Sequence, residues 1–149
     1  MAGQAMTKWH SSLPANFRYE PNDKLDFSES YRQRKMLVMV RRMFPDYQIA
    51  HIPNGGKRDK IQAARLKADG VLAGWPDLAI TGPGRWVSFI EVKDGAGTCS
   101  VAQKEVLIGL ANDGHYCGVF RTDRGLHDFM VDMGAEVRVK FPHDFMERE

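Results

Sequence analysis

The fold is decided by the stretch Gly74–Lys93, which reads GWPDLAITGPGRWVSFIEVK. Two apolar runs within it, Leu78–Ile80 and Trp86–Ile90, flank a segment rich in glycine and proline at residues 81–85. Short apolar runs bounded by such turn residues are typical of β-strands. The stretch therefore predicts a β-hairpin.

Three charged side chains of this hairpin are expected to converge. Asp77 stands where the first strand begins, while Glu91 and Lys93 are two positions apart on the second strand and so share a face. Two carboxylates brought together repel each other and lose solvent, which a divalent cation would compensate. Oxygen ligands favour Mg²⁺ or Mn²⁺ over zinc. The alternative is that the three charges lie on a solvated face of the sheet.

Pro76-Asp77 and Glu91-Val92-Lys93 are similar to the signature of the PD-(D/E)xK nuclease superfamily. The fuller run Ala63–Leu78, completed by Ser100–Gln103, resembles the VRR-NUC family of virus-type replication and repair nucleases. The likeness extends from about residue 29 to residue 121. It implies an α/β fold of the restriction-endonuclease type, with a mixed central sheet flanked by helices.

The resemblance also implies a chemistry, the hydrolysis of DNA phosphodiester bonds with Mg²⁺ or Mn²⁺ as cofactor. It assigns metal ligation to Asp77, Glu91 and the backbone carbonyl of Val92. Lys93 would assist the attack of the metal-bound water. Gln103 would position that water or hold Lys93, although its sequence context explains it equally well as a helix-capping side chain.

A fourth metal ligand is expected from the first predicted helix, Tyr31–Phe44, which contains no glycine or proline. Ser30 and Gln33 match a capping box at its start. The resemblance implies an acidic residue here that reaches the metal, and Glu29 fits. Helical spacing aligns Glu29 with inward-facing residues, namely Gln33, Met36, Val40 and Met43. The alternative is a carboxylate that faces water and interacts favourably with the helix dipole.

The run Met36–Val40 is too apolar for a helix with a single buried face, so it predicts either a subunit interface or core burial on both sides. Small, single-domain VRR-NUC members resemble Holliday junction resolvases that act as homodimers. The resemblance therefore implies branched DNA as substrate and a homodimer as the active species. A flap- or end-trimming nuclease and a catalytically silent DNA-binding module remain the alternatives.

Further elements follow from periodicity and turn residues. Asp59 is expected to cap a short helix that Gly70 ends, and Ser100 with Gln103 to open a helix that ends near Gly114. Other expected elements are strands at residues 47–52, 116–120 and 137–141 and a helix at residues 126–133. Residues 1–26 are expected to form a polar arm, and residues 27–149 a single nuclease domain.

Composition limits the partners. The chain has 149 residues, 43% of them hydrophobic, and a net charge of only +2, so DNA contacts must come from local clusters. The expected contacts, each also explicable as an ordinary solvated or turn residue, are Asn54, Lys57, Arg58, Arg65 and Lys67. Two distant cysteines and no membrane-length apolar run predict a protein without membrane contact, in the cytoplasm of a bacterial or phage-infected cell.

Overall fold

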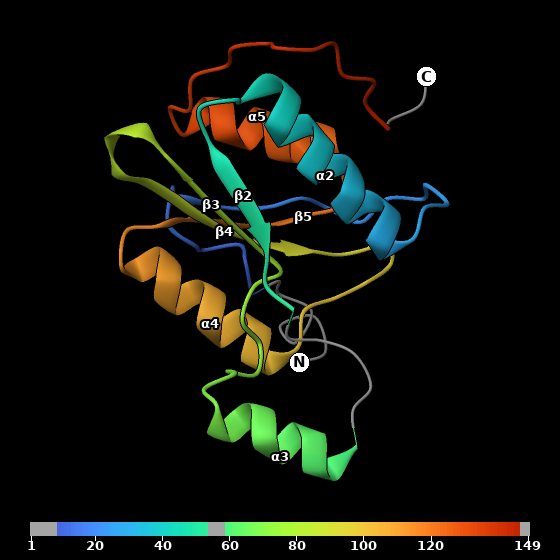
Figure 1. The fold of residues 1–149 in the computed structure, drawn as a ribbon, viewed down its shortest axis with the longest axis vertical. Helices are drawn as coiled ribbons and strands as arrows, with labels where there is room; N and C mark the ends of the chain where they lie inside the picture. Colours follow the sequence, from blue (N-terminus) through green and yellow to red (C-terminus); the bar gives the residue numbers. More distant parts are fainter. Residues whose placement is uncertain (1–8, 54–58, 147–149) are drawn as a thin grey trace.

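The computed structural model describes residues 9–53 and 59–146 (Figure 1). Its centre is a five-stranded sheet in the order β1-β5-β4-β3-β2. The strands are β1 (Phe17–Tyr19), β2 (Gln48–His51), β3 (Leu78–Gly82), β4 (Trp86–Val92) and β5 (Tyr116–Phe120). The helices are α2 (Glu29–Met43), α3 (Lys60–Ala68), α4 (Val101–Asn112) and α5 (Asp123–Asp132).

The sheet is mixed, which confirms the predicted α/β fold. Strands β2, β3 and β4 are antiparallel neighbours, whereas β5 runs parallel to β4 and to β1. The predicted hairpin is β3 and β4, joined by a short 3-10 turn at Pro83–Arg85. Helix α4 then makes the crossover that a parallel β4–β5 pair requires.

Helices cover both faces of the sheet, as Figure 1 shows, with α2 and α5 on one side and α4 on the other. Because side chains alternate along a strand, Ile90 and Val92 join the core under α2 and α5. Phe89 packs with Leu107 of α4 on the opposite face. The same alternation places Glu91, between Ile90 and Val92, on the α4 face.

The apolar run of α2 is explained by burial within the chain. Met36, Met39 and Val40 are fully buried, and Leu37 packs against the same core. Core burial within the chain therefore accounts for Met36, Met39 and Val40 without a partner subunit, while a subunit interface on α2 stays a prediction. The inward stripe also includes Arg32, which is fully buried, whereas Glu29 is exposed at the start of the helix.

Other boundaries differ from the sequence predictions. Ser28, not Ser30, caps α2, since its side chain accepts a hydrogen bond from the Tyr31 amide. Within the expected polar arm, β1 pairs with β5 as a sheet edge. Three residues with little hydrophobic pattern gave no periodic signal from which this strand could be recognised.

The strand expected at Val137–Phe141 is not formed. Its alternating pattern is real, but the amides of Arg138 and Lys140 donate to the carbonyls of Met43 and Arg42 instead. Those carbonyls belong to the last turn of α2, which has no internal partners for them. The segment therefore satisfies a helix end rather than a sheet edge.

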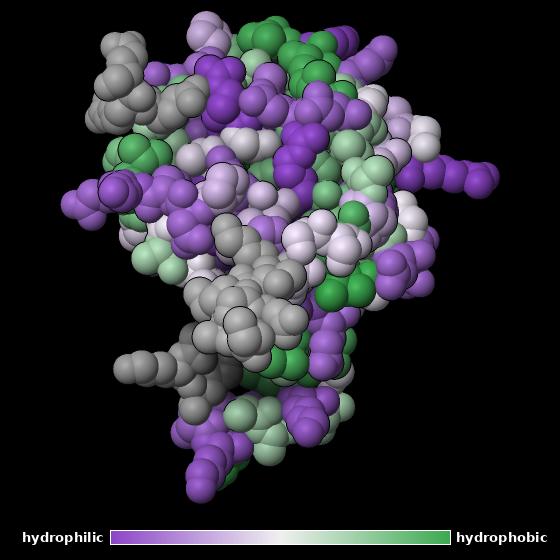
Figure 2. All heavy atoms as spheres, turned by 180° about the vertical axis from the view of Figure 1, so that it is seen from behind, coloured by the Kyte–Doolittle hydropathy of each residue, from purple (hydrophilic) through white to green (hydrophobic). Residues whose placement is uncertain are grey.

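Helix α3 stands apart from the sheet. All its residues except the half-buried Leu66 are exposed, and Ile61 is 75% exposed. Asp59 caps it as predicted, and Gly70 follows its end with a φ of 99°. Figure 2 shows the other side of the molecule, with hydrophilic residues over most of that face and the α3 end projecting below the body. None of the helices in the described ranges has the length and apolar character needed to span a bilayer.

Candidate functional site

The hairpin brings Asp77, Glu91 and Lys93 together at the ends of β3 and β4. The register pairs Leu78 with Ile90, which sets Asp77 opposite Glu91. Asp77 is anchored there, because its Oδ2 accepts a hydrogen bond of 2.8 Å from the Val92 amide. The Lys93 Nζ lies 3.4 Å from Glu91 Oε2. Two carboxylates and one ammonium thus share one corner of the sheet.

Gln103 caps α4 and also contacts the site through Glu91, while its expected roles toward the attacking water and Lys93 stay predictions. Its Oε1 accepts from the Ser100 amide in a complete capping box at the start of α4. Its Nε2 donates to Glu91 Oε2 at a distance of 2.9 Å. The first turn of α4 is therefore hydrogen-bonded directly to the acidic pair.

Glu91 is the most perturbed group of the site. Its side chain is 2% exposed, and burial, reinforced by the nearby Asp77 carboxylate, raises its pKa to about 8 despite the opposing effect of Lys93. Glu91 Oε1 is buried and accepts no hydrogen bond from the described residues. A buried carboxylate oxygen without a partner is costly unless a cation occupies the space beside it.

These donors fit a hard divalent cation. Asp77 and Glu91 supply carboxylate oxygens, the chemistry that Mg²⁺ and Mn²⁺ prefer, and Mg²⁺ needs only one or two protein carboxylates beside water and substrate. In the described part of the chain, no group of three or more His, Cys, Asp and Glu side chains is placed to hold a metal ion, so water and substrate would have to complete the coordination beside Asp77 and Glu91. The arrangement is an open site rather than a closed structural cage.

Glu29 lies at the rim of this corner. Although the residue as a whole is exposed, partial burial of its carboxyl group raises its pKa, Lys93 opposes that shift, and Asp77 and Asp94 add to it. These interactions place Glu29 within electrostatic reach of the site, although within residues 9–53 and 59–146 it makes no direct hydrogen bond to the other acids. Its assignment as a metal ligand stays a prediction.

The expected DNA contacts divide into two groups. Arg65 and Lys67 are exposed in the last turn of α3. Asn54, Lys57 and Arg58 lie outside the described residues.

The segments before and after α3 are both held close to Asp77. On one side, the Ile52 amide donates to the Asp77 carbonyl at 2.7 Å, and His51 Nδ1 lies 3.0 Å from the same oxygen. On the other side, Gly74 packs against the first turn of α4, where an added Cβ would lie 2.5 Å from the Ala102 carbonyl carbon. Helix α3 therefore projects from the edge of the sheet that carries the acids.

Gly74→Ala should destabilise the protein and slow any activity of the site, because Gly74 has a φ of 83° and no room for a Cβ. Gly84→Ala is the matched control, since its φ is 69° but nothing lies within 4 Å of an added Cβ. We expect Gly84→Ala to cost about 1 kcal/mol from backbone strain and Gly74→Ala about 2 kcal/mol or more. Urea unfolding of both variants measures the difference. Equal losses of unfolding free energy in Gly74→Ala and Gly84→Ala would contradict the close approach of Gly74 to α4.

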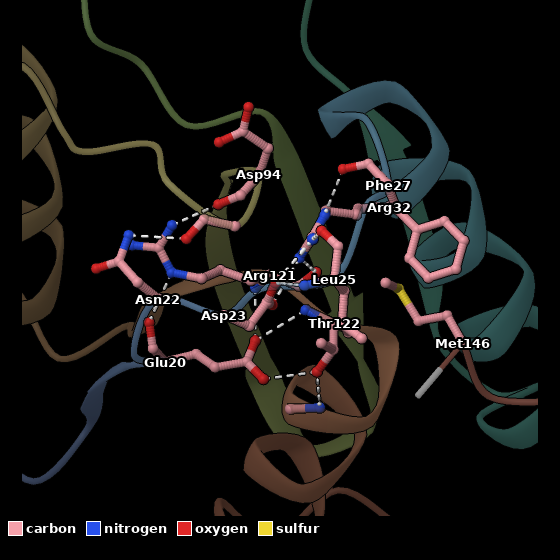
Figure 3. Close-up of polar contacts among 12 residues, drawn as sticks. Glu20, Asn22, Asp23, Leu25, Phe27, Arg32, Asp94, Arg121, Thr122 and Met146 are labelled. Carbon is pink, nitrogen blue, oxygen red and sulfur yellow. Dashed lines mark hydrogen bonds and ion pairs between the residues drawn. The ribbon is translucent and has the colours of Figure 1, made fainter. Parts of the chain in front are cut away.

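Two buried arginines, which sequence patterns did not reveal, fix the surroundings of the site (Figure 3). Arg32 of α2 binds Asp23 through two nitrogens, at 2.7 and 2.9 Å. It also donates to the carbonyls of three residues, Leu25, Phe27 and Arg121.

Arg121 follows β5 and holds the loop that begins after Lys93. It donates to the carbonyls of Asp94 and Gly97, at 2.6 and 2.9 Å. The Glu20 carboxylate accepts hydrogen bonds from the backbone amides of Arg121 and Thr122 and from the Thr122 hydroxyl. This network ties the segment after β1, the start of α2 and the loop after β4 into one rigid support.

Glu91 also makes the metal-free protein sensitive to pH. Its folded pKa of about 8 exceeds the ordinary 4.5, so between these values the folded state binds more protons than the unfolded state. Stability should therefore fall as pH rises from about 5 to 8. Glu91→Gln removes the ionisation and should stabilise the metal-free protein by about 2 kcal/mol or more at pH 8.

Urea unfolding in EDTA at several pH values measures this effect, with Glu105→Gln on the exposed part of α4 as the control. We expect a flatter pH dependence for Glu91→Gln alone. If the free energy of unfolding depends on pH in the same way for wild type and Glu91→Gln, the charged form of Glu91 is not disfavoured in the folded state.

The chain was compared with known proteins. No family model matches the sequence, and no curated protein matches it either. Among solved structures, one described as "VRR_NUC domain protein" is 28% identical, with a TM-score of 0.59, over 73% of this chain and 89% of that one. This likeness includes most of the chain and agrees with the resemblance seen in its motifs. The sequence motif, the mixed sheet and this structural match together support an assignment to the VRR-NUC family of nuclease domains.

Proposed function

We propose that the protein is a divalent-metal-dependent DNA endonuclease that acts on branched DNA such as Holliday junctions. The observation that carries the metal dependence is the buried, unpartnered Oε1 of Glu91, beside Asp77 and Lys93. Such an oxygen is best explained by a cation that binds during function. The family assignment supports the nuclease activity.

Asp77 and Glu91, the Val92 carbonyl and Glu29 would hold Mg²⁺ or Mn²⁺. When bound, the cation supplies a Lewis acid for the phosphate and lowers the pKa of a coordinated water. Lys93 is 12% exposed, and its ammonium faces the acids, where it offsets negative charge that develops on the phosphate. Gln103 fixes the orientation of Glu91 through its amide.

DNA binding would use the projecting α3, whose exposed basic residues are Lys60, Arg65 and Lys67. Because α3 arises beside Asp77, a duplex that contacts α3 would present its backbone near the acids. Phosphate contacts of this kind give affinity without sequence preference. Asn54, Lys57 and Arg58, which precede α3 in the sequence, are also proposed DNA contacts.

We also propose a homodimer, because paired incision of a four-way junction needs two sites related by the two-fold symmetry of the DNA. A cytoplasmic location is proposed on the basis of the two free, buried cysteines, Cys99 and Cys117. Burial raises their pKa values to about 11 and about 12, so both remain neutral thiols.

A panel of labelled substrates tests the substrate preference. Four-way junction, flap, duplex and single-stranded DNA are incubated with Mg²⁺, and the oligomeric state is measured by light scattering under the same conditions. We expect symmetric paired cuts in the junction and a dimeric mass. Flaps cut in preference to junctions by a monomer would favour the flap-trimming alternative, and binding without cleavage would favour a silent DNA-binding module.

The metal dependence has a separate expected pattern. Mg²⁺ and Mn²⁺ should support cleavage, EDTA should abolish it, and Ca²⁺ should permit binding with little turnover, because Ca²⁺ accepts looser coordination and polarises water less. Initial cleavage rates in each ion, with binding measured in parallel, check this pattern. Cleavage at an undiminished rate in EDTA would exclude a metal mechanism.

A further inference from the structure

A cavity lies near the candidate active site, between the N-terminal segment, the loop after β4 and the start of α4. Its volume is about 480 Å³, within the range of small-ligand sites. Three aromatic side chains, one lysine and several small polar groups line it. The residues that matter for its chemistry are Trp9, His10, Tyr19, Asn22, Cys99 and Lys104.

The aromatic wall is well ordered by its own contacts. The rings of His10 and Tyr19 stack with centroids 3.8 Å apart and an angle of 3° between their planes. Trp9 meets Tyr19 edge to face at 5.8 Å. The Tyr19 hydroxyl accepts a hydrogen bond of 2.6 Å from Arg121, which fixes the ring. Flat rings held in this way are suited to stacking on a planar heterocycle.

Positive charge lies next to the Trp9 ring of this wall. Lys104 Nζ lies 5.6 Å from the centre of the Trp9 ring, so one cation borders the aromatic surface. Asn22 contributes an amide that is anchored to the Gly95 carbonyl at 2.9 Å. Aromatic rings beside a lysine form the combination that binds a base together with its phosphate in single-stranded nucleic acid.

The cavity is connected to the acids through adjacent residues. Lys104 follows Gln103, whose amide binds Glu91. Cys99 precedes Ser100, the cap of the same helix. Across the loop, a Cβ added to Gly97 would lie 3.3 Å from the Lys93 side chain. A strand that passes the acids therefore reaches this cavity within a short distance.

We propose that this cavity binds an unpaired nucleotide of the DNA substrate, with its base against the Trp9, His10 and Tyr19 rings and a phosphate at Lys104. The inference rests on the proposed nuclease function and makes it more specific. A nucleotide next to the cleaved bond would have to be unstacked from its duplex. Unpaired nucleotides occur at branch points and flaps, so the cavity would favour such DNA over a continuous duplex.

Binding of fluorescein-labelled hexathymidylate to the full chain, followed by anisotropy in Ca²⁺, tests the proposal without requiring cleavage. Trp9→Ala and Lys104→Ala should each weaken binding about tenfold, because a stacked base and a phosphate contact are lost. The protein contains a matched control, Lys140 with its Nζ 5.7 Å from the Phe141 ring on another, exposed segment. Phe141→Ala and Lys140→Ala should bind the probe as wild type does.

Trp9 packs edge to face on Phe17, so Trp9→Ala could unfold the protein, and circular dichroism checks its fold. If Trp9→Ala unfolds, Lys104→Ala provides the decisive measurement. Unchanged affinity in Lys104→Ala, or an equal loss in Lys140→Ala, would overturn the proposal. Junction cleavage measured in parallel separates the two claims. If the wild type cleaves DNA but neither Trp9→Ala nor Lys104→Ala weakens probe binding, the cavity proposal is rejected and the nuclease function stands. If both substitutions weaken probe binding but the wild type cleaves no DNA, the nuclease function is rejected and the cavity proposal stands.

Discussion

Asp77→Asn should lose at least about a thousandfold in cleavage rate, because the several kcal/mol of stabilisation that a bound cation supplies would be removed. The fold should survive. The side-chain amide oxygen that this substitution leaves can still accept the hydrogen bond from the Val92 amide, which is 2.8 Å long in the parent protein. DNA binding should also persist, since it depends on lysine and arginine contacts to phosphate.

Lys93→Ala gives the contrasting result. It should be about as inactive as Asp77→Asn but still bind Mn²⁺, since the ammonium is proposed to act on water and phosphate and not on the metal. Calorimetric Mn²⁺ titration of both variants, together with cleavage rates, distinguishes the two roles. Loss of Mn²⁺ binding in Lys93→Ala would contradict the role assigned to the lysine.

Arg32→Met should cost about 3–5 kcal/mol of unfolding free energy, which is a large part of the stability of an ordinary domain. The substitution keeps the volume but leaves the Asp23 carboxylate and three backbone carbonyls without their donor. The Arg32 guanidinium also holds the pKa of Asp23 below its usual value, so the remaining acid loses a strong partner.

Arg138→Met is the matched control for this prediction. Its ion pair with Asp46 has the same 2.7 Å separation as Arg32 with Asp23, but its side chain is 65% exposed, compared with 0% for Arg32. Exposed pairs contribute about 1 kcal/mol or less. Thermal or urea unfolding of the two variants compares them directly. Similar stability losses would show that the buried network is not a major source of stability.

The hairpin and its charges could be predicted because their signals are local. Alternating apolar residues and turn chemistry define β3 and β4, and the spacing between Asp77 and Glu91 follows from the register that the hairpin imposes. Of the three helix caps predicted from short motifs, Asp59 and Ser100 were confirmed, whereas Ser30 was wrong because Ser28 caps α2. These features need no knowledge of distant contacts.

The arginine network could not be predicted for the opposite reason. Arg32 and Arg121 are 89 positions apart, and an arginine in an amphipathic helix is usually exposed. Only the return of the N-terminal segment along β5 supplies the acids and carbonyls that allow both arginines to be buried. Residues 137–141 are a second example. Their sequence pattern is typical of a strand, but tertiary contacts place them against the end of α2 and not at an edge of the sheet.

The central claim is that the Asp77, Glu91 and Lys93 corner cuts DNA with the help of a divalent cation. Its most direct test is the initial rate of four-way junction cleavage in Mn²⁺ for wild type and Asp77→Asn, purified and assayed side by side. We expect paired nicks from the wild type, none when EDTA is present, and a rate at least about a thousandfold lower from Asp77→Asn. Nicking by Asp77→Asn at the wild-type rate would contradict this account.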